Sequence, residues 1–135
     1  MTDFRHVTDD FAVSPQITPA DAAAAAAEGY ALIINNRPDG EAPGQPSSAE
    51  LEAAVRAAGM DYAHIPFVGR PGPDQVRAVH DAAAQAKGPV LAFCRSGTRS
   101  ITVWTLGQAV LDRRDRGELA RLASDAGYDL AAILS

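Results

Sequence analysis

The sequence predicts a three-layer α/β fold, in which a mostly parallel sheet of about four to five strands is flanked by helices. Short apolar runs bounded by turn residues alternate with segments of helical composition, a pattern typical of βαβ units. Helix start and stop signals separate these segments repeatedly. The chain has 135 residues, 47% of them hydrophobic, which suffices for one core without metal or disulfide support. We therefore expect a single domain over residues 1–135, with residues 1–10 and the last few peripheral.

The first alternation runs from residue 11 to residue 35. Phe11–Ser14 is a plausible short strand. Thr18 is a good N-cap for a helix that has Pro19 at its first position, and Gly29 is placed to end that helix. The apolar run Tyr30–Asn35 is typical of a strand buried on both faces.

The next alternation follows the same order. Ser47 and Glu50 form a capping-box sequence, which predicts a helix to about Ala58, before a strand over Tyr62–Phe67. A third helix is expected from Pro73.

The remainder contains one more strand and is otherwise helical. Lys87-Gly88 ends the third helix, and Pro89–Phe93 is the last predicted strand. Three helices are expected beyond residue 99, marked by Ile101–Leu111, by Leu119 with Leu122, and by Leu130–Leu134.

Charge and composition exclude several classes of function. The formal net charge is −5, and Arg113, Arg114 and Arg116 are the one basic cluster, so a nucleic-acid partner is not expected. The sequence shows no signal-peptide pattern and no apolar run near the ~20 residues of a membrane span, so we expect a cytoplasmic protein without membrane contact. A single cysteine and three histidines without metal-motif spacing indicate neither a metal site nor a cofactor.

Ligands of open parallel sheets bind at the carboxyl ends of the strands, where loops lead into helices. Three predicted loops lie at that edge, at residues 35–41, 68–72 and 94–100. The last of them begins at Cys94 and reads CRSGTRS. Its backbone N–H groups, the start of the following helix and the planar fork of Arg99 together predict a cradle for an anion.

The same environment suits a nucleophilic cysteine. Helix N-termini and nearby cations favour the thiolate form of a cysteine, and the thiolate is the attacking species. We therefore expect Cys94 and Arg99 to be catalytic. Two simpler interpretations stay open: Cys94 is a buried structural residue, or the loop binds anions without turning them over.

The other site candidates surround this pair. Gly97 is expected where a side chain would block the turn. Arg37, from the first loop, would widen the positive mouth of the site, although a solvated side chain is the simpler interpretation. Asp39 fits a turn over residues 37–40 and could also supply a catalytic acid. His64 is interpreted as a core histidine. The anion is further expected to contact the remaining polar residues of the cysteine loop, Arg95, Ser96, Thr98 and Ser100.

The sequence resembles the phosphatase-like domain of the beta-lactamase-hydrolase-like proteins. The resemblance covers roughly Phe4 to Leu111 and rests on VSPQI at 13–17, IINNRPDGE at 33–41, HIP at 64–66 and CRSGTRS at 94–100. It implies a protein-tyrosine-phosphatase-like fold and a cysteine nucleophile, with Ser100 in the position of a hydroxyl that contacts the nucleophile. Some relatives are fused to a persulfide dioxygenase, so the resemblance also implies such an enzyme as a possible partner. The cysteine loop alone is also similar to that of single-domain rhodaneses.

Two departures from the phosphatase pattern concern the chemistry. Four residues separate Cys94 from Arg99, one fewer than in the tyrosine-phosphatase signature. Residues 68–72, where such phosphatases commonly carry a general acid, read VGRPG. Sulfur transfer needs no such acid, because its leaving group departs as a stable anion.

We therefore expect a sulfurtransferase that carries sulfane sulfur as a Cys94 persulfide. It would take the sulfur from a small anionic or persulfide substrate and pass it to a thiol acceptor. The alternative is a phosphatase-like hydrolase that forms a phosphocysteine and uses Asp39 as its acid. A further alternative is a non-catalytic anion-binding module.

Overall fold

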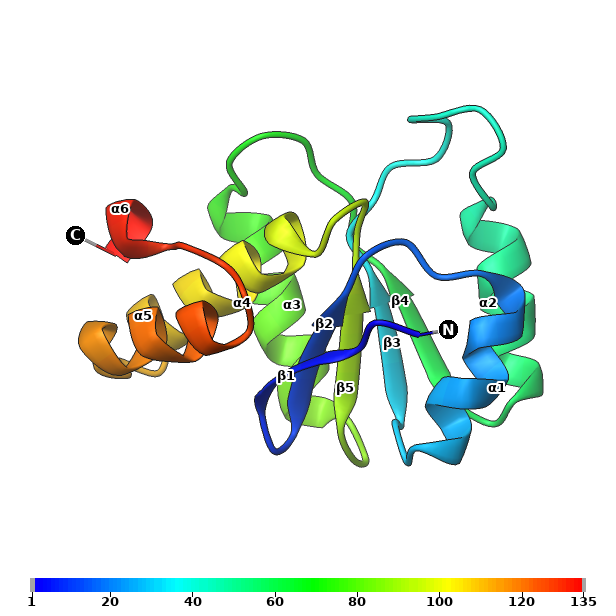
Figure 1. Ribbon diagram of the computed structural model, residues 1–135, viewed down its shortest axis with the longest axis horizontal. Coiled ribbons are helices and arrows are strands. Elements are labelled where there is room, and N and C mark those ends of the chain that lie inside the picture. Colours follow the sequence, from blue (N-terminus) through cyan, green and yellow to red (C-terminus); the bar gives the residue numbers. More distant parts are fainter. Residues whose placement is uncertain (1, 135) are drawn as a thin grey trace.

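The computed structural model describes residues 2–134, in which five strands form one sheet of order β1-β2-β5-β3-β4. β1 pairs with β2 in antiparallel orientation, and the other pairings are parallel. Figure 1 shows the central position of β5 between β2 and β3. The strands are β1 (Arg5–Thr8), β2 (Phe11–Ser14), β3 (Leu32–Asn35), β4 (Asp61–His64) and β5 (Val90–Phe93).

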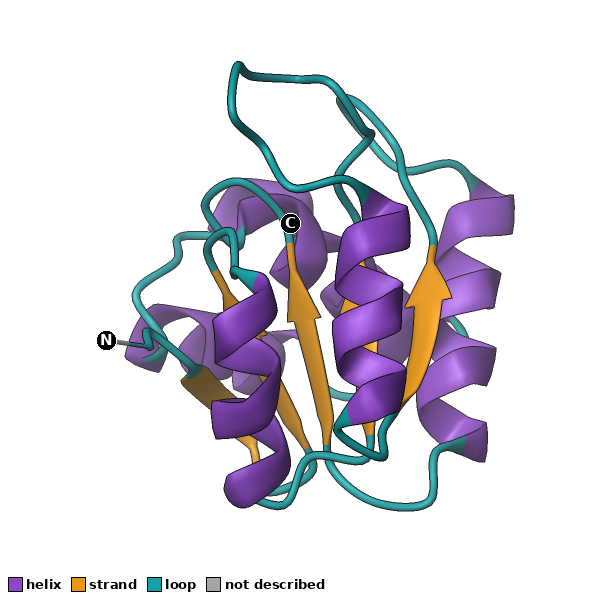
Figure 2. Ribbon diagram, turned by 90° about the vertical axis from the view of Figure 1, so that its right-hand side faces the viewer, coloured by secondary structure: helices purple, strands orange, loops and turns teal. Residues whose placement is uncertain are grey.

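Helices cover both faces of this sheet, which confirms the predicted three-layer α/β fold. α1 and α2 lie on one face, and α3, α4 and α5 on the other (Figures 1 and 2). The helices are α1 (Pro19–Ala27), α2 (Ser48–Ala57), α3 (Pro73–Gln85), α4 (Thr98–Val110), α5 (Arg116–Asp125) and α6 (Ala131–Leu134).

Local capping explains where several helices begin. Thr18 and Ser47 are N-caps whose side chains accept hydrogen bonds from the N–H groups of Asp21 and Glu50, and both capping boxes are complete. Each cap satisfies N–H donors that the first helical turn leaves without a partner. The predicted starts of α1 and α2 are therefore confirmed.

Several strand bounds differ from the prediction. β3 begins at Leu32 rather than Tyr30. β1, which the sequence pattern did not indicate, is half-exposed or exposed apart from Val7, so it shows no apolar run. β4 ends at His64 rather than Phe67. The Ile65 N–H still bonds the carbonyl of Asn35 at 2.9 Å, but the pairing with β3 goes no further than His64.

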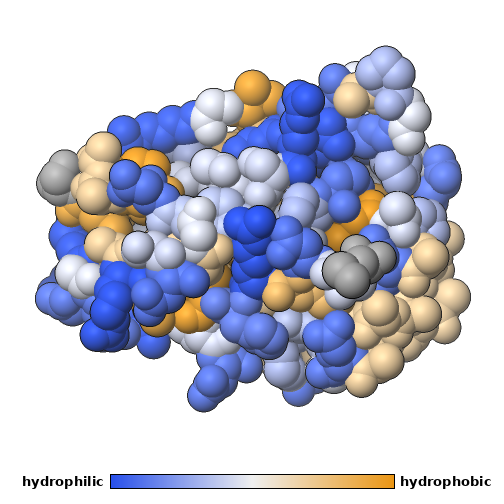
Figure 3. All heavy atoms as spheres, viewed as in Figure 1, coloured by the Kyte–Doolittle hydropathy of each residue, from blue (hydrophilic) through white to orange (hydrophobic). Residues whose placement is uncertain are grey.

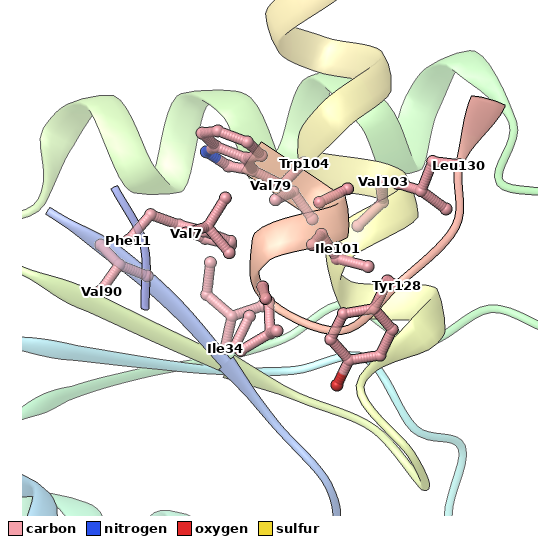
Figure 4. Packing of buried hydrophobic residues seen from close by; sticks show 14 of the residues in the cluster. Val7, Phe11, Ile34, Val79, Val90, Ile101, Val103, Trp104, Tyr128 and Leu130 are labelled. Atoms are coloured by element: carbon pink, nitrogen blue, oxygen red, sulfur yellow. The ribbon is translucent and has the colours of Figure 1, made fainter. Parts of the chain in front are cut away.

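The parallel strands divide their side chains between two hydrophobic clusters. Ile33 and Leu91 pack toward α1 and α2, whereas Ile34 and Ala92 pack toward α3, α4 and α5. Figure 4 shows the second cluster, in which Trp104 stacks on Phe11 with ring centroids 4.9 Å apart. Because strands buried on both faces can shift little, their carboxyl ends form a rigid edge for the loops that follow.

The surface in Figure 3 is largely hydrophilic, with a pale hydrophobic area over α1, whose residues are mostly alanine. Val68 and Val110 are the large hydrophobic side chains that stand exposed among residues 2–134. No helix within that range is long and apolar enough to cross a membrane.

Candidate functional site

The cysteine loop leaves the middle of the sheet and is held by the loops on either side. The Gln16 N–H, from the segment after β2, donates to the carbonyl of Arg95 at 3.2 Å. On the other side, the Asn36 N–H after β3 donates to the carbonyl of Phe93 at 2.9 Å. Loops at this edge extend beyond the strand arrowheads in Figure 2. The site predicted at the carboxyl ends of the strands is therefore built from chain segments far apart in sequence.

Cys94 lies at the base of this loop with a relative exposure of 1%. The backbone N–H of Gly97 donates to its Sγ at 3.1 Å. Gly97 is the N-cap of α4 and has φ +93°, a conformation that glycine adopts without steric cost. The loop thus turns a backbone donor at a helix start toward the sulfur, as expected for an anion cradle.

Arg99 lies in the first turn of α4 and is fixed by two acceptors. Its Nη1 and Nη2 donate to the two carboxylate oxygens of Glu41 at 2.9 and 2.8 Å, and Nη1 also donates to the carbonyl of Phe67 at 3.1 Å. The hydrogen bond to Glu41 raises the pKa of Arg99, and the charge and hydrogen bonding of Cys94 add to that rise. The guanidinium is therefore anchored near Cys94, and its Nε and part of its Nη2 make no hydrogen bond to other side chains or carbonyls of residues 2–134.

Arg37 is bound to the same carboxylate rather than solvated. Its relative exposure is 4%, and its Nε donates to Glu41 Oε1 at 2.9 Å while Nη1 donates to Gln16 Oε1 at 2.9 Å. Hydrogen bonds from Arg99 first and Arg37 second lower the pKa of Glu41 from 4.5 to about 2. The simpler interpretation of Arg37 as a solvated side chain is wrong.

Side chains from β3 and β4 hold the backbone of Arg37. The Asn35 side chain accepts from the Arg37 N–H at 2.8 Å and donates to the Tyr62 hydroxyl at 2.9 Å. His64 is exposed at the end of β4, so the interpretation as a core histidine is wrong, although its Nε2 lies 2.8 Å from the Arg37 carbonyl. The first loop is thereby fixed where Glu41 can reach both arginines.

The remaining predicted residues lie at different depths. Asp39 is exposed, and its carboxylate accepts the N–H of Ser48 at the start of α2 at 2.8 Å. Ser100 is fully buried, and its Oγ has no hydrogen-bond partner among residues 2–134, so the hydrogen bond to Cys94 that the resemblance implies is not formed there. Arg95, Ser96 and Thr98 are exposed on the cysteine loop, where the Ser96 and Thr98 hydroxyls lie 3.1 Å apart. Their contacts with an anion stay a prediction, as does an acid role for Asp39.

Sequence reasoning missed three residues of the site. Glu41 stands four residues after Arg37, a spacing that could have suggested their ion pair. Gln16 and Tyr128 gave no such signal, because their partners are distant in sequence. The Tyr128 hydroxyl donates to the Ser96 carbonyl at 2.9 Å.

A cavity of about 340 Å³ lies beside Arg99 and is lined also by Arg70, Thr102 and Ile133. A larger one of about 520 Å³ is lined by His80, Val90 and other residues near the amino end of β5, away from Cys94. Residues 2–134 contain no cluster of three metal-ligating side chains.

A Gly97→Ala substitution is expected to destabilise the fold by about 2–4 kcal/mol. The new Cβ would meet the Tyr128 hydroxyl and would also sit at a positive φ. Gly44→Ala is the matched control, because Gly44 has φ +76° but open space around its Cβ position. The expected loss of unfolding free energy for this control is about 1–2 kcal/mol. Urea unfolding measures both, and equal losses would contradict a close contact between Gly97 and Tyr128.

The ion pairs of Glu41 give stability a defined dependence on pH. Because its pKa falls from 4.5 to about 2 on folding, the contribution of Glu41 is full above about pH 4.5 and is lost as the pH falls toward 2. The unfolding free energies of wild type and Glu41→Gln should therefore differ most above that range and converge in acid. Glu52→Gln, which breaks the exposed Arg56–Glu52 pair, is the control and should change little at any pH.

Comparison with known proteins shows which family the chain resembles. The phosphatase-like domain model of the beta-lactamase hydrolase-like protein matches residues 3–111. A beta-lactamase hydrolase-like protein of Agrobacterium fabrum is 39% identical over 127 residues, covering 93% of this chain but 30% of its own length. This chain therefore spans about 30% of that curated relative.

Solved structures share the fold of this chain. A "putative phosphatase" of Neisseria meningitidis z2491 superposes with TM-score 0.87 at 32% identity, covering 99% of this chain and 95% of its own. Tk-PTP shares the fold, with TM-score 0.68 at 18% identity over 94% of this chain and 86% of its own. The chain belongs to the family of beta-lactamase hydrolase-like phosphatase-like domains, which have a protein-tyrosine-phosphatase-like fold.

Proposed function

We propose that this domain is a cysteine-dependent hydrolase of phosphate monoesters. The observation that carries the proposal is the anchored guanidinium of Arg99 beside Cys94, in a loop whose Gly97 N–H points at the same sulfur. Such an arrangement suits the equatorial oxygens of a phosphoryl group in the transition state of its transfer. Membership of a phosphatase-like family supports this chemistry over the sulfur transfer that the loop length favours.

The reaction would proceed in two displacements at phosphorus. The Cys94 thiolate attacks the phosphorus atom, an S–P bond forms, and the ester oxygen leaves with the bonding electron pair. Water then attacks the phosphocysteine, the S–P bond breaks, and inorganic phosphate and the thiolate are released. Arg99 and the loop N–H groups neutralise charge on the phosphoryl oxygens in both steps.

The leaving group must depart without much help from a proton donor. Residues 68–72 contain no carboxyl group. Asp39 is exposed and engaged with the Ser48 N–H, and Glu41, with its pKa near 2, holds no proton at neutral pH. Because a general acid contributes about 10²–10⁴ in rate, the proposed substrates are phosphate esters of acidic alcohols, above all aryl phosphates.

A series of aryl phosphates tests this proposal. Turnover by the wild-type protein is expected to fall steeply as the leaving phenol becomes less acidic, because the departing oxygen keeps its negative charge. Cys94→Ser should lower turnover of every substrate by at least about 10³-fold, with the unfolding free energy nearly unchanged. The measurement is phenol release under steady-state conditions.

Asp39→Asn is the informative control in the same series. An unchanged dependence on leaving-group acidity is expected, because the Asp39 carboxylate accepts a helix N–H rather than facing the sulfur. A selective loss on poor leaving groups would restore Asp39 as the acid. Full activity of Cys94→Ser would overturn the covalent mechanism itself.

Sulfur transfer is the second candidate, favoured by one specific observation. Four residues separate Cys94 from Arg99, as in rhodanese-like loops, and a persulfide exchange needs no proton donor. In that reaction the thiolate attacks the outer sulfur of the donor, an S–S bond forms on Cys94, and the donor leaves as an anion. A thiol acceptor would then remove the sulfur.

Intact mass distinguishes the two chemistries. The wild-type protein, exposed briefly to thiosulfate or glutathione persulfide, is expected to show no Cys94-dependent adduct of one sulfur if phosphate esters are its substrates. An adduct that Cys94→Ser lacks and that a thiol removes would favour the sulfurtransferase. If the protein neither hydrolyses aryl phosphates nor forms a sulfur adduct but binds phosphate, the result favours a non-catalytic anion-binding module. A partner persulfide dioxygenase and a cytoplasmic location also stay proposals, since this chain covers 30% of its curated relative.

A further inference from the structure

We infer that Tyr128, which lies outside the residues matched by the family model, is a positioning residue for the nucleophile. The Tyr128 hydroxyl donates to the carbonyl of Ser96 at 2.9 Å. That carbonyl and the N–H of Gly97 belong to one planar peptide unit, and the N–H donates to Cys94 Sγ at 3.1 Å. Tyr128 therefore holds one end of the peptide whose other end is hydrogen-bonded to the sulfur.

The loop does not fix this peptide by its own backbone preferences. A peptide flip would change φ of Gly97, now +93°, and glycine populates negative φ as readily as positive φ. The flipped peptide would point a carbonyl oxygen, rather than an N–H, toward Cys94. A contact from outside the loop is therefore needed to keep the donor in place, and the Tyr128 hydroxyl supplies it.

Tyr128 is itself well placed to serve as an anchor. Its backbone N–H donates to the Ala123 carbonyl at the end of α5, at 2.8 Å. The Arg5 guanidinium lies over its ring, 5.2 Å from the centroid. Figure 4 shows the ring at the margin of the hydrophobic cluster, with the hydroxyl directed out of it.

The chemistry of the hydroxyl suits a donor, and its contact with the loop is close. A tyrosine hydroxyl is protonated at neutral pH, and burial raises the pKa of Tyr128 further. A Cβ on Gly97 would meet this hydroxyl, so the oxygen also blocks the space beside the turn. A hydrogen bond to the Ser96 carbonyl additionally polarises the peptide and strengthens its N–H as a donor.

The test is a pH titration of the Cys94 thiolate by its ultraviolet absorbance, corrected with the Cys94→Ser counterpart of each protein. Tyr128→Phe is expected to move the midpoint upward by about half a pH unit, equivalent to about a threefold loss of thiolate below the midpoint. The plateau at high pH should not change. If Tyr128→Phe only loosened the packing, the free energy of unfolding would fall but the midpoint of the Cys94 titration would not move.

Tyr30→Phe is the matched control. Its hydroxyl is also buried, has no hydrogen-bond partner among residues 2–134, and lies before β3, at the opposite end of the sheet from Cys94. No shift of the midpoint is expected from this variant, and the unfolding free energy of each protein verifies that both fold.

The amide resonance of Gly97 provides a second measurement. In the wild-type protein it should follow the Cys94 titration, and in Tyr128→Phe that response should shrink. An unshifted absorbance midpoint together with an undiminished amide response would overturn the inference. The inference rests on Cys94 as the proposed nucleophile, but neither measurement requires turnover, so its failure and that of the proposed hydrolysis are distinguishable.

Discussion

One carboxylate organises the site. Glu41 accepts hydrogen bonds from both Arg37 and Arg99, and thereby joins the loop after β3 to the start of α4. Arg37 is almost fully buried, and a buried guanidinium without a counter-charge would be strongly destabilising. Glu41 offsets that cost and also fixes the guanidinium of Arg99. The parallel strands bring the loops together, and this carboxylate fixes their two arginines in the neighbourhood of Cys94.

The sequence carried enough local information to predict the elements and the position of the site. The capping residues Thr18 and Ser47 define helix starts through contacts three residues away, which a sequence pattern records directly. The strand ending at Phe93 is buried on both faces, so its sequence is a continuous run of apolar residues. Because β5 is predicted to be parallel to its neighbours, Cys94, which follows it directly, is placed at the carboxyl edge of the sheet.

Contacts between distant segments could not be predicted in the same way. Arg37 was expected to be solvated because arginine usually is, whereas its burial depends on Gln16 and Glu41 meeting around it. Tyr128 reaches the cysteine loop from beyond α5, over 32 residues of chain. The short strand β1 lacks an apolar pattern because most of its residues are half-exposed or exposed. In each case tertiary packing, rather than local preference, determines the outcome.

The charges of the site show why backbone geometry matters for its chemistry. Arg37 and Arg99 contribute two positive charges, Glu41 one negative charge, and Cys94 a second negative charge once its proton is lost, so the reactive form has no net charge at its centre. The N–H groups of the loop and the start of α4 then add aligned dipoles to the attraction that Arg99 exerts on an incoming anion. Dipoles act only when they point correctly. The orientation of the Ser96–Gly97 peptide is therefore as important to this site as the presence of its arginines.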